Sequence, residues 1–212
     1  MDETIARDGQ SQSTKTWLVQ DYFSKPKDPR AIIFLDRDDT LIKDLGIKTH
    51  KKLPKIHLNF IRELSILTNE LKYKIIFVII TNQSKIFKGE TSVLALKIFH
   101  FLLVIYCRIH GVRIQRIVTC PHTTSVNCEC RKPKPTTILD TINNYNCESI
   151  PRFMVGNNIS DIQAGLNAGC FTIGICENIN EPTKIESNKL FLGYFTLKSS
   201  FAQDILNKMG HN

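Results

Sequence analysis

The stretch Ala31–Thr40 reads AIIFLDRDDT, and the rest of the chain can be interpreted around it. Its first five residues are apolar and rich in β-branched and aromatic types, which predicts a short buried strand. The run ends at Asp36, and Asp38 follows two residues later. Because alternate residues of an extended backbone share a face, both carboxylates are expected to project into one pocket. Two carboxylates this close require a divalent cation, a shared proton or a cationic substrate nearby.

The composition is typical of a globular protein in a reducing environment. The chain has 212 residues, 42% of them hydrophobic, which suits one domain with a substantial core. The net charge of +8 is spread along the sequence and is compatible with an anionic partner. Residues 1–15 lack the apolar core of a secretory signal, so we expect a cytoplasmic protein whose cysteines are thiols or metal ligands. The apolar segment Val93–Cys107 is too short to span a membrane and contains Lys97 and His100, so we expect a core helix.

The spacing of apolar residues predicts strands that alternate with helices. The predicted strands are Ala31–Leu35, Ile75–Ile80, Ile114–Thr119, Phe153–Val155 and Phe171–Ile175. The predicted helices are Leu58–Leu71, Thr91–His110, Thr136–Asn144, Ser160–Ala168 and Ser199–Lys208. This alternation predicts an α/β fold with a doubly wound, Rossmann-like parallel sheet. We expect the domain to occupy residues 31–212, after a partly disordered extension over 1–30 in which Trp17–Phe23 packs as a lead-in.

Four of the predicted strands are followed within two residues by a residue that can react or bind a ligand. These residues are Asp36, Thr81, Cys120 and Asn157. In open parallel sheets, ligands bind beyond the carboxyl ends of the strands. The fold is therefore expected to gather these four side chains along a single edge.

The acidic pair suits phosphoryl transfer. An aspartate at a strand end can attack a phosphoryl group and form an aspartyl-phosphate, provided that Mg²⁺ screens the negative charges. We assign the attack to Asp36. Asp38 is placed to protonate the leaving oxygen and then activate water, while its backbone carbonyl faces the metal. Thr81 offers a hydroxyl group to the phosphoryl oxygens, and Arg131 and Lys132 offer positive charge.

These motifs resemble those of the haloacid-dehalogenase-like phosphatase superfamily. Its D-x-D-x-T motif is similar to Asp36–Thr40, its Thr/Ser to Thr81, its lysine to Lys132 and its acidic motif to Gly156–Asp161. More narrowly, FLDRDDTLI, TNQSKI, CPH followed by CECRKPKP, and VGNNISDIQAGLNAG resemble the D-glycero-D-manno-heptose 1,7-bisphosphate 7-phosphatase and histidinol-phosphatase group. The likeness runs over residues 31–175, in order and with sensible spacing.

A cluster of cysteines and a histidine strengthens the narrower resemblance. Cys120, His122, Cys128 and Cys130 place three thiolates and one imidazole within eleven positions. This is a complete tetrahedral ligand set for Zn²⁺ with no open position, which indicates a structural site. The alternative is a loop with reduced cysteines. A zinc-bound loop would fix the two basic residues that follow it.

The resemblance implies an Mg²⁺-dependent phosphatase without a large cap domain, acting on a small phosphorylated metabolite. The first expected substrate is the 7-phosphate of D-glycero-D-manno-heptose 1,7-bisphosphate, and histidinol phosphate is the alternative. The resemblance also implies that Asn82, Ser84 and Arg131 bind substrate. Asn157 and Asp161 are the further magnesium ligands, the latter through water. We expect a monomer with no membrane or nucleic-acid partner, and a nucleic-acid 3′-phosphatase ranks last because no cluster of aromatic residues suited to base stacking is visible.

Several positions depart from the family pattern. Asn157 stands where the resemblance predicts aspartate, and its amide oxygen can coordinate Mg²⁺ but brings no negative charge. Asp39 replaces a glycine and adds a carboxylate beside the metal. A catalytically impaired, zinc-stabilised paralogue that binds phosphoesters is therefore the alternative to an active enzyme. Lys85 also replaces a glycine, and Gly46–Pro54 is shorter than the family's substrate loop, so these changes bear on the substrate rather than the reaction.

Overall fold

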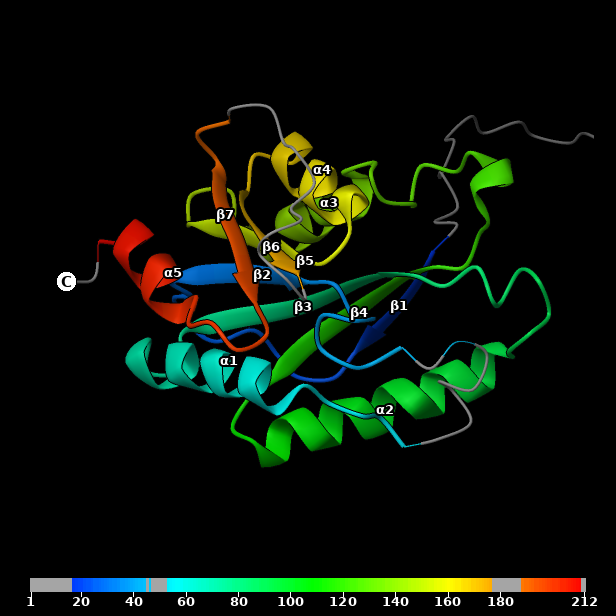
Figure 1. Ribbon diagram of the computed structural model, residues 1–212, viewed down its shortest axis with the longest axis horizontal. Coiled ribbons are helices and arrows are strands. Elements are labelled where there is room, and N and C mark those ends of the chain that lie inside the picture. Colours follow the sequence, from blue (N-terminus) through cyan, green and yellow to red (C-terminus); the bar gives the residue numbers. More distant parts are fainter. Residues whose placement is uncertain (1–16, 45, 47–52, 177–187, 211–212) are drawn as a thin grey trace, which may run out of the picture.

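The apolar segments form a seven-stranded sheet with helices on both faces (Figure 1). The structure is a computed structural model and describes residues 17–44, 46, 53–176 and 188–210. Its strands are β1 Leu18–Asp21, β2 Ala31–Leu35, β3 Ile75–Asn82, β4 Ile114–Cys120, β5 Arg152–Gly156, β6 Phe171–Cys176 and β7 Phe191–Thr196. Its α-helices are α1 Leu58–Glu70, α2 Val93–Ile109, α3 Thr136–Tyr145, α4 Ile159–Asn167 and α5 Ala202–Lys208. The strand order is β1-β4-β3-β2-β5-β6-β7, which confirms the predicted α/β class.

The central strand β2 separates two apolar layers. All five of its residues are buried, and their side chains alternate between the faces of the sheet. Ile33 and Leu35 pack in the larger cluster with residues of α1, α2 and α5, whereas Ile32 and Phe34 pack in the smaller cluster with residues of α3 and α4. β2 therefore forms the middle of the core, and the residues that follow its carboxyl end begin the site.

Both edges of the sheet differ from the expected five parallel strands. β1 lies antiparallel to β4 and is formed by part of the segment that we expected only as a packed lead-in. β7 lies parallel to β6 at the other edge and was not predicted. Neither strand contains a fully buried residue: β1 is four residues long and partly polar, and Gly193 interrupts the apolar residues of β7. The expected disorder of residues 1–14 falls outside the described residues, as does most of the expected short loop over Gly46–Pro54.

The remaining boundaries lie close to the predicted ones. Ser92 caps α2, because its side chain accepts a hydrogen bond from the backbone N–H of Ala95 at 3.0 Å. The connections at residues 36–57 and 83–92 are too short to contain a large cap domain. Among the described residues, no helix, α2 included, has both the length and the apolar character needed to cross a bilayer.

Gln115 marks an irregularity in the pairing of β3 with β4. The register passes from Phe77 opposite Ile114 to Val78 opposite Arg116, so Gln115 is the extra residue of a bulge. Its buried side chain repairs the ladder, since its Oε1 accepts the backbone N–H of Phe77 at 2.7 Å. Its backbone carbonyl meanwhile accepts the N–H of Tyr22 at 2.9 Å, just after β1. One glutamine therefore connects the central strands to the antiparallel edge.

We expect Gln115→Leu to lower the free energy of unfolding by about 1–3 kcal/mol, because it leaves the buried N–H of Phe77 without its acceptor. Urea unfolding followed by circular dichroism measures this loss. Gln163→Leu makes the same exchange on the exposed face of α4 and should stay within about 0.5 kcal/mol of the unsubstituted chain. Equal effects of the two substitutions would contradict the role assigned to Gln115.

Candidate active site

The carboxyl ends of the central strands surround one hollow of about 460 Å³. The residues predicted for the site that line this hollow are Asp36, Asp38, Thr81, Asn82, Arg131, Lys132, Asn157 and Asp161. Backbone hydrogen bonds hold the strand ends together, from Asp36 N–H to the Val155 carbonyl at 2.9 Å and from Gln83 N–H to the Cys120 carbonyl at 2.7 Å. Ser84, expected to bind substrate, does not line the hollow.

Lys132 joins two carboxylates at the floor of the hollow. Its Nζ donates to Asp36 Oδ1 at 2.5 Å and to the Ile80 carbonyl at 2.6 Å, and it pairs with Asp161 Oδ1 at 2.7 Å. Burial disfavours the charged ammonium, but Asp161 and Asp36 outweigh that penalty and raise the pKa of Lys132. The ammonium therefore keeps its charge in a place that is 3% exposed.

The same burial acts on Asp36. The pKa of Asp36 is raised to about 7, mainly by loss of solvent and also by the neighbouring carboxylates of Asp161 and Asp38, against the opposing effect of Lys132. Its second oxygen, Oδ2, has only a long contact of 3.5 Å with Thr40 Oγ1. One carboxylate oxygen of Asp36 is thus held by an ammonium, and the other is available to an electrophile or a cation.

Asp161 is positioned by the start of α4. Its Oδ2 accepts the backbone N–H of Asn158 at 2.9 Å, while Asn158 Oδ1 accepts the N–H of Ser160 at 3.0 Å, which is a capping box. Gly156 makes room for it, because a Cβ there would lie 2.5 Å from Asp161 Oδ2. Asp161 is thus bonded through one oxygen to Lys132 and through the other to this cap, and its contact with magnesium through water stays a prediction.

Asn157 faces the acidic pair from the end of β5. Thr40 Oγ1 lies 3.2 Å from Asn157 Oδ1, so the hydroxyl donates to the amide oxygen and orients it. Asp36, Asp38 and Asn157 all line the hollow, so carboxylate, amide and backbone carbonyl oxygens are available around it. Oxygen donors of this kind are the ligands that Mg²⁺ prefers, so the residues present fit a hard divalent cation.

Asp38 is held from two sides. Arg37 donates to both of its carboxylate oxygens, with NH2 at 2.8 Å from each. Gln83 Nε2 donates to Asp38 Oδ2 at 2.7 Å and to Thr81 Oγ1 at 2.9 Å. Neither Arg37 nor Gln83 was singled out from the sequence, because only the folded chain shows that their buried side chains turn toward the acidic pair.

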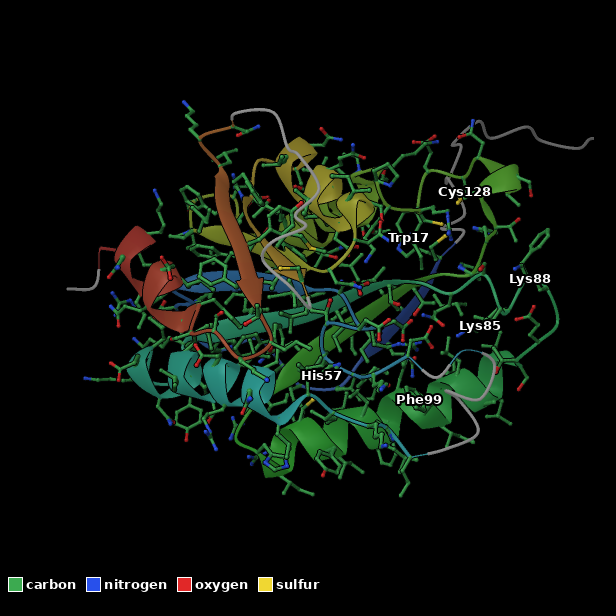
Figure 2. All side chains as sticks on the ribbon, viewed as in Figure 1. Trp17, His57, Lys85, Lys88, Phe99 and Cys128 are labelled. Carbon is green, nitrogen blue, oxygen red and sulfur yellow. The ribbon has the colours of Figure 1, made fainter. Side chains whose placement is uncertain are left out.

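Asp39 and Lys85, which replace family glycines, both contact the loop after β2. Asp39 has a φ of 55°, the left-handed conformation that glycine adopts freely and aspartate tolerates. Its Oδ1 accepts the N–H of Asp44 at 2.9 Å. Lys85 (Figure 2) pairs with Asp44 Oδ1 at 3.2 Å and donates to the Gly46 carbonyl at 2.8 Å. Asp39 therefore forms a bond within this loop, and Lys85 connects the loop to the segment that follows β3.

The cysteine cluster lies in the loop that follows β4, where Figure 2 shows Cys128. The ligand atoms of Cys120, His122, Cys128 and Cys130 all lie within 4.8 Å of one another, close enough to hold one metal ion. Sulfur atoms bound to one tetrahedral Zn²⁺ at about 2.3 Å would be about 3.8 Å apart. The sulfur of Cys128 lies 3.6 Å from that of Cys120 and 3.4 Å from that of Cys130, near that separation.

The loop is connected to the site by its last residues. Arg131 NH1 donates to the His122 carbonyl at 2.9 Å. Asn82 holds the next residue with both ends of its amide, donating to the Lys132 carbonyl and accepting the Lys132 N–H at 3.2 Å each. Asn82, expected to bind substrate, therefore positions the segment that carries Lys132.

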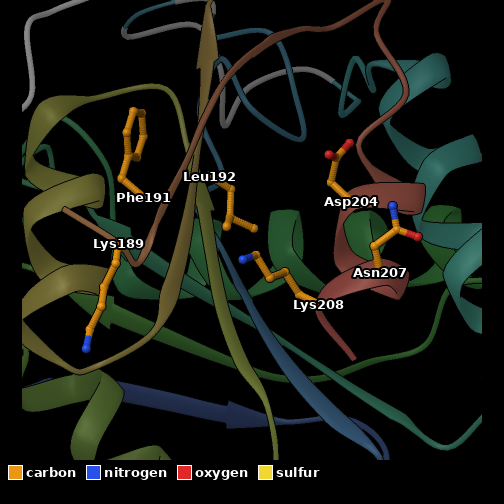
Figure 3. A pocket seen from close by; sticks show the side chains of 6 residues that line it. All are labelled: Lys189, Phe191, Leu192, Asp204, Asn207 and Lys208. Carbon is orange, nitrogen blue, oxygen red and sulfur yellow. The ribbon is translucent and has the colours of Figure 1, made fainter. Parts of the chain in front are cut away.

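A second hollow, of about 400 Å³, lies between β7 and α5 (Figure 3). It is lined by Lys189, Phe191, Leu192, Asp204, Asn207 and Lys208, none of which lines the first hollow. With a single carboxylate and no paired acid, it offers no arrangement for phosphoryl transfer.

Comparisons with known proteins agree with this geometry. A family model described as haloacid dehalogenase-like hydrolase matches residues 114–175. A D-glycero-beta-D-manno-heptose-1,7-bisphosphate 7-phosphatase of Helicobacter pylori strain J99 is 34% identical over 137 residues, which are 64% of this chain and 77% of that protein. A D-glycero-alpha-D-manno-heptose-1,7-bisphosphate 7-phosphatase of Photorhabdus laumondii is 34% identical over 181 residues, covering 76% of this chain and 92% of that protein.

Solved structures share the fold. The D,D-heptose 1.7-bisphosphate phosphatase of B. bronchiseptica, crystallised with magnesium and phosphate, has a TM-score of 0.68 and 24% identity over 84% of this chain and 99% of its own. A putative had-like phosphatase of Mesorhizobium loti has a TM-score of 0.75 and 18% identity over 93% of this chain and 94% of its own. Family model, relatives and fold agree, and the chain belongs to the haloacid dehalogenase-like hydrolase superfamily, among its phosphoric monoester hydrolases.

Proposed function

We propose that the chain is a magnesium-dependent phosphatase that removes the 7-phosphate of D-glycero-D-manno-heptose 1,7-bisphosphate through an aspartyl-phosphate. The observation that carries this proposal is the buried Lys132 ammonium, bonded to Asp36 and Asp161 beside the second acid of the pair, Asp38. The substrate is inferred from the two relatives at 34% identity, which bear that activity in their names.

In the first step, an oxygen of Asp36 attacks the phosphorus atom. A bond forms between that oxygen and phosphorus while the bond from phosphorus to the sugar oxygen breaks, and Asp38 gives a proton to the departing oxygen. Lys132 holds the other oxygen of Asp36 and so fixes the direction of attack. Because Thr81 Oγ1 accepts from Gln83, its own proton is directed to a phosphoryl oxygen.

In the second step, water attacks the aspartyl-phosphate. Asp38 takes a proton from this water as the new oxygen–phosphorus bond forms, and the bond to Asp36 breaks to restore the carboxylate. Mg²⁺, held by Asp36, the Asp38 carbonyl and Asn157, would supply positive charge to the phosphoryl oxygens. Arg131 adds a further cation at the wall of the hollow.

One observation favours a second candidate, a catalytically impaired phosphoester-binding protein. Asn157 offers the metal an uncharged oxygen, and its amide is already oriented by Thr40. A site with one negative charge fewer binds Mg²⁺ less tightly while still attracting phosphate. Monomeric state, cytoplasmic location and the absence of a nucleic-acid partner stay predictions.

For the cysteine cluster we propose a structural zinc ion. The support is the donor set of three sulfurs and one imidazole, together with its separations, which suit a tetrahedral ion with no open position. Its function would be to hold the loop from which Arg131 and Lys132 extend into the hollow.

We expect the chain with Mg²⁺ to release phosphate from D-glycero-D-manno-heptose 1,7-bisphosphate in preference to histidinol phosphate. Asp36→Asn should reduce this release to background, because an amide cannot act as the nucleophile. Asp204→Asn, the same change in the second hollow, should leave it unchanged. Both rates are measured by phosphate detection. Saturable binding without turnover in the unsubstituted chain would favour the phosphoester-binding alternative.

We expect Asn157→Asp to lower the Mg²⁺ concentration for half-maximal activity by about tenfold or more, because it adds a charge beside the cation. Titrating phosphatase activity with Mg²⁺ measures the change. Asn143→Asp, on the exposed face of α3, adds the same charge away from the hollow and serves as the control. An unchanged magnesium requirement in Asn157→Asp would show that residue 157 does not face the metal.

Protein purified without chelator should contain about one zinc ion per chain, as measured by elemental analysis. Cys128→Ala removes one ligand and should lower the zinc content and the melting temperature together. Cys176→Ala, which lies outside the cluster, should keep its zinc. Zinc-free protein with full stability would rule out the structural ion.

A further inference from the structure

We propose that Arg37, His100 and Gln20 form a positioning chain that holds the Asp38 carboxylate in place for proton transfer. This inference rests on the proposed function, in which Asp38 protonates the leaving oxygen. It concerns residues outside the hollow, because none of these three side chains lines it. From the sequence alone, no role was assigned to His100 beyond interrupting an otherwise apolar helix.

The chain begins with a guanidinium that is completely enclosed. Arg37 is 0% exposed and is among the largest fully buried side chains of the described residues. Besides the two contacts from NH2, its Nε donates to Asp38 Oδ1 at 3.0 Å, so the planar group meets the carboxylate side-on. The ring of Phe99, on α2 (Figure 2), lies 5.3 Å from the guanidinium carbon and supports it.

His100 continues the chain, and the chemistry of arginine decides its tautomer. Arg37 NH1 lies 3.0 Å from His100 Nε2, and a guanidinium has no lone pair with which to accept. His100 Nε2 must therefore accept, which places the ring proton on Nδ1. Nδ1 lies 2.8 Å from Gln20 Oε1 and donates to it, while Gln20 Nε2 donates to the Tyr22 hydroxyl at 2.7 Å.

The hydrogen bonds of the chain therefore run in one direction, outward from the site: Arg37 donates to His100 on α2, and His100 donates to Gln20 on the edge strand β1. Without His100, NH1 of the buried Arg37 loses its acceptor, and the guanidinium would rotate toward a different acceptor. Because the same guanidinium holds the Asp38 carboxylate, Asp38 would move with it. Gln83, on the opposite side, holds only Asp38 Oδ2 and does not replace the fork of Arg37. A general acid contributes only when it lies within hydrogen-bond reach of its oxygen, and misplacement by about 1 Å can cost about 10²-fold in rate.

A purely structural role for His100 predicts a different outcome from a positioning role. If His100 only satisfies a buried arginine, removing it lowers stability and affects all substrates of the folded protein alike. If it positions Asp38, the loss depends on how much the leaving oxygen needs a proton. The sugar alkoxide needs one, whereas 4-nitrophenolate is a good leaving group and departs without one.

The test compares kcat/KM on D-glycero-D-manno-heptose 1,7-bisphosphate with kcat/KM on 4-nitrophenyl phosphate, because kcat/KM reports on formation of the aspartyl-phosphate and not on its hydrolysis, which is common to both substrates. We expect His100→Leu to lower kcat/KM on the sugar at least about tenfold more than on the aryl ester, as Asp38→Asn also should. The amide of glutamine can accept from Arg37 and donate to Gln20. His100→Gln should therefore recover most of the activity on the sugar that His100→Leu loses. Leu103→Ala, a buried change one turn along α2, should leave the ratio of the two rates as it is.

Two outcomes overturn the inference alone. One is equal loss on both substrates in His100→Leu while Asp38→Asn shows the selective loss; the other is a His100→Gln variant as defective as His100→Leu. If thermal melting shows that His100→Leu is unfolded, Gln20→Leu serves as the test, since it removes the next residue of the chain from a half-buried strand. We expect Gln20→Leu to lower activity on the sugar about threefold more than on the aryl ester. The absence of this selective loss overturns the inference. A folded, unsubstituted chain that turns over neither substrate overturns the proposed function, and the inference with it.

Discussion

The site depends on one buried ammonium placed between two carboxylates. Lys132 lies 2.5 Å from Asp36 Oδ1 and 2.7 Å from Asp161 Oδ1, and without it these like charges would repel each other in a place from which water is excluded. The three residues come from the end of β2, the start of α4 and the loop after β4, so one ion triad joins segments far apart in the sequence. Removing the cation would leave uncompensated buried negative charge, which strongly lowers the stability of the fold.

The surrounding structure is largely a support for that ammonium. Asn82 holds the backbone of Lys132 from the end of β3, and the proposed zinc ion in the cysteine cluster would confine the loop just before it. Gly156 allows Asp161 to approach the backbone, and the helix cap fixes the direction of its carboxylate. Each device restricts a different segment. Together they place the charges before any phosphate arrives, which is the condition for electrostatic catalysis without reorganisation.

The sequence predicted the parts of the molecule whose burial is complete. β2 and β3 are enclosed on both faces and show unbroken apolar runs, so their ends located Asp36 and Thr81 correctly. β1 and β7 are edge strands; β1 is short and partly polar, and β7 is interrupted by Gly193, so neither was predicted as a strand. The sequence also does not show which side chains from distant segments contact each other in the fold. The path from Asp38 to α2 exists only because the helix packs under the sheet and brings His100 to a buried guanidinium, and no local pattern encodes that contact.

In the proposed mechanism, the balance of charge would allow a weaker metal ligand at residue 157 beside an intact nucleophile at residue 36. The carboxylates of Asp36, Asp38 and Asp161 face two buried cations, Arg37 and Lys132, so one negative charge remains for a divalent cation. An aspartate in place of Asn157 would add a second, which strengthens the pull on the cation but also repels an incoming phosphate. The amide weakens both effects while Thr40 keeps its oxygen directed at the site. In the proposed site, Asn157 would therefore act on metal affinity and phosphate attraction in opposite directions, whereas Asp36 is held chiefly by its ion pair with Lys132.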